Sequence, residues 1–314
     1  MRVLITGALG FIGSHLADAL LAAGDEVLGI DDLSGNVVDD LPGATIVHDD
    51  ARAITSLRAG RVDLVVHAAS PVGPVALLDR ESIVAEIIET TQAVLRFCDQ
   101  HQLPLINISS SEVYGFSGTY REFDDCVVSP RLSHRLQYAS GKLAAEQLVR
   151  TSRVPSVTIR PFNVAGPRQS AAKGFVIPTF CEQALAERPL TVFDGGDQER
   201  CPTGVWDLVD FILRVGRDPH RFAGGVFNVG HPGNRTTVLD LARMVLRLTG
   251  SSSPVEHTTG KAVHGPAYEE ARGRVKVPDI TRARTTGWQP RVGLEDLIRL
   301  TIQEIVAGDT ISVR

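Results

Sequence analysis

The chain has 314 residues, of which 32 are Lys or Arg and 37 are Asp or Glu, and 43% of its residues are hydrophobic. These values are ordinary for a globular protein, and they exclude an intrinsically disordered or collagen-like chain. The formal net charge of −5 does not indicate the basic surface that binds nucleic acid or anionic membranes, so we expect a small-molecule partner, no nucleic acid and no membrane.

The first half of the chain alternates short apolar runs with longer amphipathic segments. Strands are predicted at 3–6, 26–31, 45–47, 63–68, 105–109 and 157–160, and helices at 11–23, 82–101 and 138–150. Continuous apolar strands that alternate with helices predict an α/β fold with a doubly wound parallel Rossmann sheet. We assign this sheet to residues 1–165.

The second half has a less regular pattern. Helices are predicted at 177–187, 205–215, 238–248 and 294–307, and the loops between them contain Gly and Pro. Thr237 is expected to cap one of these helices, with Asp240 three residues later. The pattern predicts a smaller substrate-binding lobe at 166–314, and a further strand at 224–229 is expected to return to the sheet.

The cysteines and the apolar runs bear on the compartment. The 4 cysteines are far apart and include no C-x-x-C pair, so neither a zinc site nor a disulfide framework is indicated. No apolar run reaches the roughly 18 residues that span a bilayer, and the start of the chain lacks the pattern of a signal peptide. We therefore expect free thiols, no metal site and a cytoplasmic protein.

Three glycines follow the first predicted strand at intervals of three residues and precede a helix: Gly7, Gly10 and Gly13. Glycines at these positions let the backbone approach a pyrophosphate, and the helix N-terminus supplies N–H groups and a positive dipole. We therefore predict a dinucleotide site, in which Phe11 and Ile12 also border the cofactor.

Asp31 ends the next predicted strand, eighteen residues beyond Gly13. This is close to the spacing of about 20 residues expected for a carboxylate that binds a ribose diol. With no arginine beside it, the acid favours NAD over NADP, because it would repel a 2′-phosphate. Asp50 and Ala51, after the third strand, are expected to reach the adenine, and the alternative for Asp50 is a solvated acidic loop.

Tyr138 and Lys142 are at i and i+4 and therefore share one face of the predicted helix. An ammonium there, near a bound nicotinamide, lowers the pKa of the phenol so that it can act as a base near neutral pH. Ser110, Ser111 and Glu112 follow the fifth strand, at the carboxyl end of the sheet, where ligands of such folds bind. We predict that these residues form a catalytic site beside the dinucleotide.

With these motifs the chain resembles the extended short-chain dehydrogenase/reductase superfamily, which contains NAD-dependent epimerases, dehydratases and decarboxylases of nucleotide sugars. The resemblance also includes the motifs His67-Ala68-Ala69, Arg160-Pro161-Phe162-Asn163 and Gly287-Trp288-Gln289-Pro290. It implies NAD as cofactor, a UDP-sugar as substrate and a homodimer. It further implies that Ala69 borders NAD, that Ser110 bonds the sugar O4, and that the diphosphate is held by Asn163, Phe193 and Arg200.

Glu112 separates the branches of this superfamily. Dehydratases carry an Asp-Glu pair, and simple 4-epimerases usually lack the carboxylate, whereas Ser111-Glu112 resembles the UDP-glucuronate decarboxylases. Tyr268 and Arg274 take the positions of a tyrosine and an arginine near the substrate carboxylate in that branch, and an arginine fork suits a planar carboxylate. The same resemblance implies substrate contacts for Pro71 and Arg168.

The resemblance therefore implies an NAD-dependent UDP-glucuronate decarboxylase. In that reaction, C4 is oxidised by Tyr138 and NAD, and CO2 leaves the 4-keto acid. Glu112 and Arg274 are expected to handle the carboxylate and the C5 proton, and the product is UDP-xylose or the UDP-4-ketopentose. A UDP-sugar 4-epimerase and an NDP-hexose dehydratase of the same fold are the alternatives. A non-catalytic dinucleotide binder is disfavoured, because it would need none of the residues Tyr138, Lys142, Ser110 and Glu112.

Overall fold

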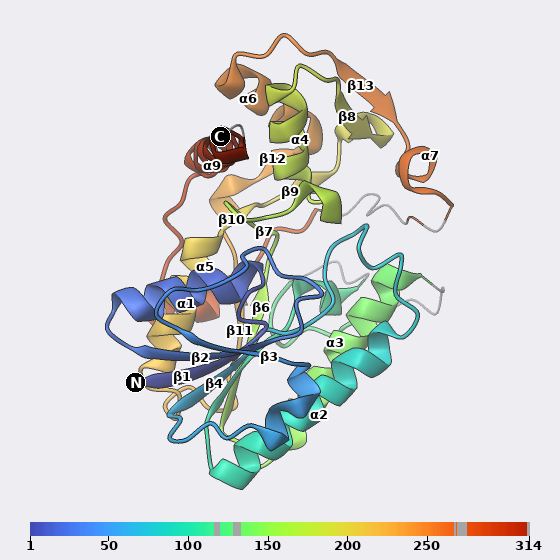
Figure 1. The fold of residues 1–314 in the computed structure, drawn as a ribbon. Coiled ribbons are helices and arrows are strands. Elements are labelled where there is room, and N and C mark those ends of the chain that lie inside the picture. Colours follow the sequence, from blue (N-terminus) through green and yellow to red (C-terminus); the bar gives the residue numbers. More distant parts are fainter. Residues whose placement is uncertain (116–119, 128–132, 267, 269–274, 313–314) are drawn as a thin grey trace.

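The computed structural model describes residues 1–314 except 116–119, 128–132, 267, 269–274 and 313–314. In this part of the chain the largest element is a seven-stranded parallel sheet with the order β11-β6-β5-β4-β1-β2-β3 (Figure 1). The order reverses between β1 and β4, so the predicted doubly wound Rossmann sheet is confirmed. The strands are β1 (Arg2–Thr6), β2 (Glu26–Asp31), β3 (Thr45–His48), β4 (Leu64–His67), β5 (Leu105–Ile108), β6 (Ser156–Pro161) and β11 (Val226–Val229).

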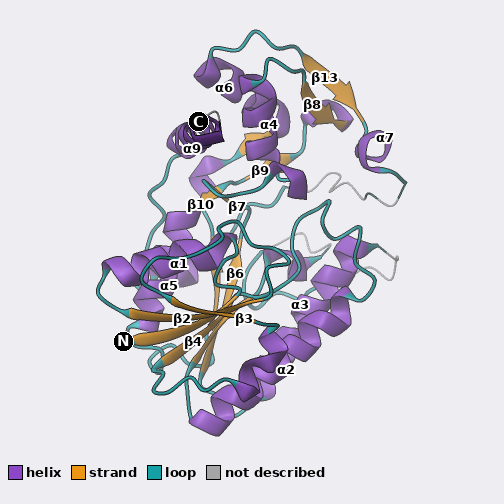
Figure 2. Ribbon diagram, in the orientation of Figure 1, coloured by secondary structure: helices purple, strands orange, loops and turns teal. Residues whose placement is uncertain are grey.

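Helices cover both faces of this sheet (Figure 2). Successive residues of a strand point to opposite faces, so Val3 and Ile5 pack in one apolar cluster and Leu4 packs in another. A parallel strand buried on both faces therefore has a continuous apolar sequence. The first cluster includes residues of α1 (Phe11–Ala22) and α5 (Val205–Gly216), and the second includes residues of α2 (Ile83–His101) and α3 (His134–Thr151).

The second lobe packs around an apolar core of its own, which contains Phe180, Leu241 and Leu297. Its longer helices are α4 (Val176–Leu185), α6 (Val238–Thr249) and α9 (Leu294–Ser312). The shorter elements in this half of the chain are β7 (Val164–Ala165), β8 (Leu190–Phe193), β9 (Glu199–Arg200), β10 (Thr203–Gly204), β12 (Thr236–Thr237), β13 (Val255–Thr258), α7 (Gly260–His264) and α8 (Thr281–Arg284). No helix in the described part of the chain combines the length and the apolar character needed to cross a membrane.

Two elements from beyond residue 165 return to the sheet. Strand β11 pairs with β6, with Val226 opposite Thr158, as the sequence predicted. Helix α5, which the sequence assigned to the second lobe, packs with α1 on one face of the sheet. The polypeptide therefore crosses between the two lobes more than once.

The predicted Thr237 cap of α6 is also present, because the Thr237 hydroxyl accepts the N–H of Asp240 at 3.0 Å.

Helix α3 begins at His134 and not at the predicted Tyr138. Ser133 caps it, because the Ser133 hydroxyl accepts the N–H of Leu136 at 3.2 Å. The first turn is mostly polar, so a search for apolar spacing does not find it. The earlier start places Arg135 three residues before Tyr138 and near it on the helix surface.

Candidate active site

A cavity of about 670 Å³ extends along the sheet and into the second lobe. Its wall includes the turn after β1, the loops after β4 and β5, strand β8 and the segment after α7. The turn after β1 and the loop after β4 lie where the strand order reverses, which is where sheets of this type bind ligands. Residues from both halves of the chain thus border one space.

The turn between β1 and α1 has no room for side chains. Gly7 has a φ of 70°, and a Cβ added to it would lie 2.8 Å from the backbone of Ala69; a Cβ on Gly13 would lie 2.0 Å from the carbonyl oxygen of Gly7. Helix α1 starts with no capping side chain and no acid in its first turn among the described residues. Its first N–H groups can therefore bind an anion such as a pyrophosphate. Gly10, Phe11 and Ile12 line the cavity beside them.

Asp31 lies at the end of β2 in the cavity wall and is 6% exposed. The N–H groups of Leu9 and Leu33 each donate to one of its oxygens at 2.9 Å. These two bonds fix the plane of the carboxylate. A carboxylate accepts about four hydrogen bonds, so both oxygens keep capacity for the hydroxyls of a ribose.

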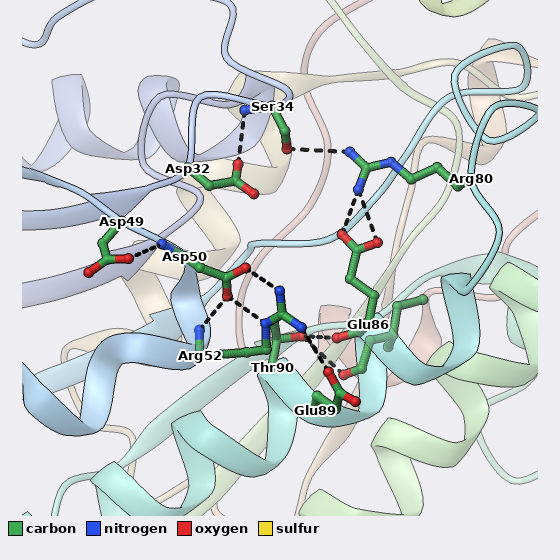
Figure 3. A network of polar contacts seen from close by, with 10 residues as sticks. Asp32, Ser34, Asp49, Asp50, Arg52, Arg80, Glu86, Glu89 and Thr90 are labelled. Carbon is green, nitrogen blue, oxygen red and sulfur yellow. Dashed lines mark hydrogen bonds and ion pairs between the residues drawn. The ribbon is translucent and has the colours of Figure 1, made fainter.

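Asp50 and Ala51 border the same end of the cavity. Arg52 donates to the two carboxylate oxygens of Asp50 at 2.9 and 2.7 Å and also donates to Glu89 of α2. Figure 3 shows these contacts. The hydrogen bonds from Arg52 hold the pKa of Asp50 below its ordinary value, although burial acts in the opposite direction. Asp50 therefore reaches the cavity with its carboxylate already bound to an arginine.

Tyr138 and Lys142 lie together beside the end of β5. The Lys142 ammonium is 5.9 Å from the centre of the Tyr138 ring and donates to the carbonyl of Ile108 at 2.9 Å. Burial raises the pKa of Tyr138, the Ser110 hydroxyl lowers it, and the charge of Glu112 raises it further. Burial also lowers the pKa of Lys142 to about 8. The phenol thus stays protonated in the protein alone, and a positive charge beside it would favour the phenolate.

Glu112 lies between two cations. Arg135 donates to both of its oxygens at 2.9 Å, and Lys276 donates to one of them at 2.5 Å. Burial raises the pKa of Glu112, but the charges and hydrogen bonds of Arg135 and Lys276 outweigh burial and hold this pKa well below its ordinary range. Glu112 is therefore ionised near neutral pH and cannot donate a proton there.

The sequence did not predict these two partners of Glu112. Arg135 lines the cavity, whereas Lys276 is outside its lining, and the Lys276 side chain is 3% exposed. Arg135 is three residues before Tyr138, so the two side chains are neighbours on a helix that begins at His134. With that helix start known, the spacing would have indicated Arg135 as a residue of the site. The Lys276 contact joins residues 164 positions apart, and no local pattern indicates it.

Most of the residues predicted to bind substrate line the cavity, namely Pro71, Asn163, Phe193, Arg200 and Tyr268. The rings of Phe193 and Tyr268 meet nearly edge to face, with centroids 5.9 Å apart, and form an aromatic wall. The buried amide nitrogen of Asn163 has no hydrogen-bond partner among the described residues. An acceptor oxygen of a ligand would satisfy it.

Arg168 and Arg274 differ from that group. The Arg168 guanidinium pairs with Asp18 of α1 at 2.7 Å, and its backbone N–H donates to Glu304 of α9. Arg168 lies outside the lining of the cavity, so this geometry does not support its expected substrate contact. Arg274 falls outside the described residues.

Comparisons with known proteins agree with this fold. The model of the NAD dependent epimerase/dehydratase family matches residues 3–230. UDP-glucuronic acid decarboxylase 4 of Arabidopsis thaliana is 32% identical over 98% of this chain and 70% of its own. UDP-glucose 4-epimerase of Mycolicibacterium smegmatis is also 32% identical, over 96% of this chain and 98% of its own. The structure of UDP-glucuronic acid 4-epimerase from Bacillus cereus in complex with UDP-glucuronic acid and NAD is 27% identical, covers 98% of this chain and 99% of its own, and has a TM-score of 0.81.

Proposed function

Since this chain belongs to the NAD dependent epimerase/dehydratase family, its cofactor is NAD, and we propose that it decarboxylates UDP-glucuronate. The observation that supports this reaction is the pair of cations at Glu112, where Arg135 donates to both carboxylate oxygens and Lys276 donates to one of them. Two cations at one carboxylate leave an excess of positive charge, and the carboxylate of a sugar acid has the complementary charge. A neutral hydroxymethyl group would gain nothing from this charge.

We assign the cofactor to the part of the cavity that begins at the glycine turn. The N–H groups at the start of α1 hold the pyrophosphate, and Asp31 accepts hydrogen bonds from the ribose. Asp50 and Ala51 border the adenine, and Ala69 borders the cofactor from the loop after β4. We assign the contacts with the pyrophosphate to five residues that line the cavity there, namely Gly7, Gly10, Phe11, Ile12 and Gly13.

Asp31→Ala is expected to weaken NAD binding roughly 10- to 100-fold, because hydrogen bonds to a charged group contribute about 1.5–3 kcal/mol. Titration calorimetry with NAD measures the change, and thermal unfolding verifies that the variant folds. Asp39→Ala is the matched control, because Asp39 is exposed and lies outside the cavity lining. An unchanged affinity in Asp31→Ala, or equal use of NADP by the wild type, would contradict the role of Asp31.

The proposed reaction starts with oxidation at C4. Tyr138 takes the proton of the sugar O4, and Lys142 stabilises the resulting phenolate by its charge. NAD, when bound, supplies the acceptor for the C4 hydride and later returns it. Ser110 lies beside the phenol and hydrogen-bonds the same oxygen of the sugar.

The second step is loss of CO2. A sugar acid oxidised at C4 is a β-keto acid, so the electrons of the C5–C6 bond move into the new carbonyl as CO2 leaves. Ser110 and Tyr138 stabilise the developing oxyanion by hydrogen bonding. C5 then takes a proton from water; reduction at C4 would give UDP-xylose, whereas early release would give the UDP-4-ketopentose. We assign the contact with the substrate carboxylate to Arg135, which lines the cavity and is held by Glu112.

The residue before Glu112 disfavours a dehydratase. Elimination of water needs an acid that protonates the leaving oxygen as well as a base that removes the C5 proton. The ionised Glu112 could serve only as the base, and Ser111, its neighbour in the cavity wall, offers no acidic proton. A 4-epimerase uses the same Tyr138 and Lys142, and its distinguishing step is rotation of the keto sugar in the site.

A parallel incubation separates these reactions. The enzyme is given UDP-glucuronate, UDP-glucose, UDP-N-acetylglucosamine and dTDP-glucose, and the products are followed by mass spectrometry and NMR. We expect loss of CO2 from UDP-glucuronate, with or without loss of two further hydrogens. Loss of water from any substrate identifies a dehydratase, and an inverted C4 at unchanged mass identifies an epimerase; either result without CO2 release would contradict the proposal.

We also propose a homodimer that forms through α2 and α3. These two helices pack closely, since a Cβ on Gly141 would lie 3.0 Å from Ile87 and 3.3 Å from Val84. Their outer surfaces carry partly exposed apolar residues, among them Ile88 and Leu148. Light scattering coupled to size exclusion measures the assembly, and Ile88→Glu should shift a dimer to monomers.

A further inference from the structure

The contact between Lys276 and Glu112 joins distant parts of the chain next to the proposed reaction centre. The Lys276 ammonium is buried 2.5 Å from Glu112 Oε1. Burying an ammonium is unfavourable unless a negative group compensates for its lost hydration. Because Lys276 lies outside the cavity lining while Glu112 and Arg135 lie in it, the ammonium is placed to act through Glu112.

We propose that Lys276 is a positioning residue for decarboxylation: it pins the Glu112 carboxylate, which holds the Arg135 guanidinium in the cavity wall near Tyr138. This inference rests on the proposed function. Arg135 bonds both oxygens of Glu112, and Lys276 adds a third bond to Oε1, so the carboxylate is held from two directions. The Glu112 N–H also donates to the Ser110 hydroxyl at 3.1 Å, which links this cluster to the hydroxyl beside Tyr138.

The segment that carries Lys276 is anchored independently of this ion pair. The carbonyl of Asp279 accepts a hydrogen bond from Asn228 at 3.1 Å, and its carboxylate lies 3.4 Å from Arg121. Pro278 packs against Gly230, where an added Cβ would lie 2.7 Å from the proline ring. Lys276→Met therefore removes the charge while these anchors keep the segment in place.

The charge of Lys276 depends on pH around pH 8. Burial lowers the pKa of Lys276 to about 8, the charge of Glu112 raises it, and the charges of Arg135 and Arg200 lower it. The ammonium is thus present below about pH 8 and is lost as the pH rises through that value. Lys276→Arg keeps the positive charge throughout, because a guanidinium does not deprotonate in this range.

The test compares the wild type, Lys276→Met and Lys276→Arg between pH 6.5 and pH 9.5 with UDP-glucuronate, an interval of about 1.5 units on either side of the Lys276 pKa. At low pH we expect kcat/KM of Lys276→Met to be roughly 10- to 100-fold below the wild type. Above about pH 8 the two should converge, because the wild-type lysine is then neutral, while Lys276→Arg should stay above Lys276→Met. Titration of Lys142 affects all three proteins and cancels in these ratios. If the ratio of kcat/KM between the wild type and Lys276→Met does not change with pH, the role of Lys276 is merely structural and the proposal is overturned.

The interaction free energy of the ion pair between Lys276 and Glu112 can also be measured without any substrate. Chemical unfolding of the wild type, Lys276→Met, Glu112→Gln and the double variant forms a double-mutant cycle. We expect coupling between the two residues near pH 7 that disappears near pH 9.5, and no coupling would overturn the proposal whatever the substrate is. Absence of CO2 release by the wild type would instead refute the proposed function, and the cycle would still decide whether Lys276 pins Glu112.

Discussion

Tyr138→Phe is expected to slow the first hydride transfer strongly, so that no NADH absorbance appears on the time scale of the wild type when UDP-glucuronate is added. The substitution keeps the ring in its buried site and deletes the oxygen that accepts the O4 proton. A positioned general base contributes about 10²- to 10⁴-fold, so we expect a loss of about 10³-fold. Single-turnover absorbance with an excess of enzyme measures this step apart from product release.

A matched control for this experiment is Tyr114→Phe. Tyr114 is also buried, and its hydroxyl donates to Asn228 at 2.8 Å, but it lies outside the cavity lining. Its loss should lower stability by about 1 kcal/mol and leave hydride transfer intact. Lys142→Met should approach the effect of Tyr138→Phe, because the buried phenol then loses the neighbouring ammonium. Most activity surviving in Tyr138→Phe would refute the assignment of the base.

The sheet could be predicted from the sequence because its strands are buried on both faces. Strand β2 occupies the predicted 26–31, and each of the other sheet strands lies within two residues of its predicted bounds at both ends. Helix ends depend instead on capping contacts. Ser133 starts α3 with a hydroxyl bond, and apolar periodicity carries no information about such a bond.

The site also contains features that the sequence reveals and features that it does not. The glycine turn and the pair of Tyr138 and Lys142 depend on spacing within one element, so the sequence reveals them. The partners of a charged side chain depend on the folded chain. Arg168 was expected to contact the substrate, yet its guanidinium pairs with Asp18 of α1. Lys276 likewise reaches Glu112 from a distant part of the chain.

Arg160→Leu is expected to lower the free energy of unfolding by about 3–5 kcal/mol, because it leaves a carboxylate buried without its cation. Glu146 lies one helical turn beyond Lys142 and accepts hydrogen bonds from Arg160 at 2.6 Å and from the Ser109 hydroxyl at 2.5 Å. The side chains of Glu146 and Arg160 are each 6% exposed, so water cannot replace the lost partner. Urea unfolding near neutral pH measures the change, and Arg150→Leu, at an exposed position of α3, is the matched control.

The double variant Glu146→Leu with Arg160→Leu gives the more demanding version of this prediction. If the cost of Arg160→Leu comes from an uncompensated charge, removing Glu146 as well should restore part of the lost stability, since two apolar side chains pack without that penalty. If the cost comes only from lost packing of Arg160, which lies 4.8 Å from the Tyr114 ring, the second substitution should add to the loss. Equal or lower stability of the double variant would therefore contradict the electrostatic origin, and a gain over Arg160→Leu would establish that the buried Glu146 charge requires its arginine.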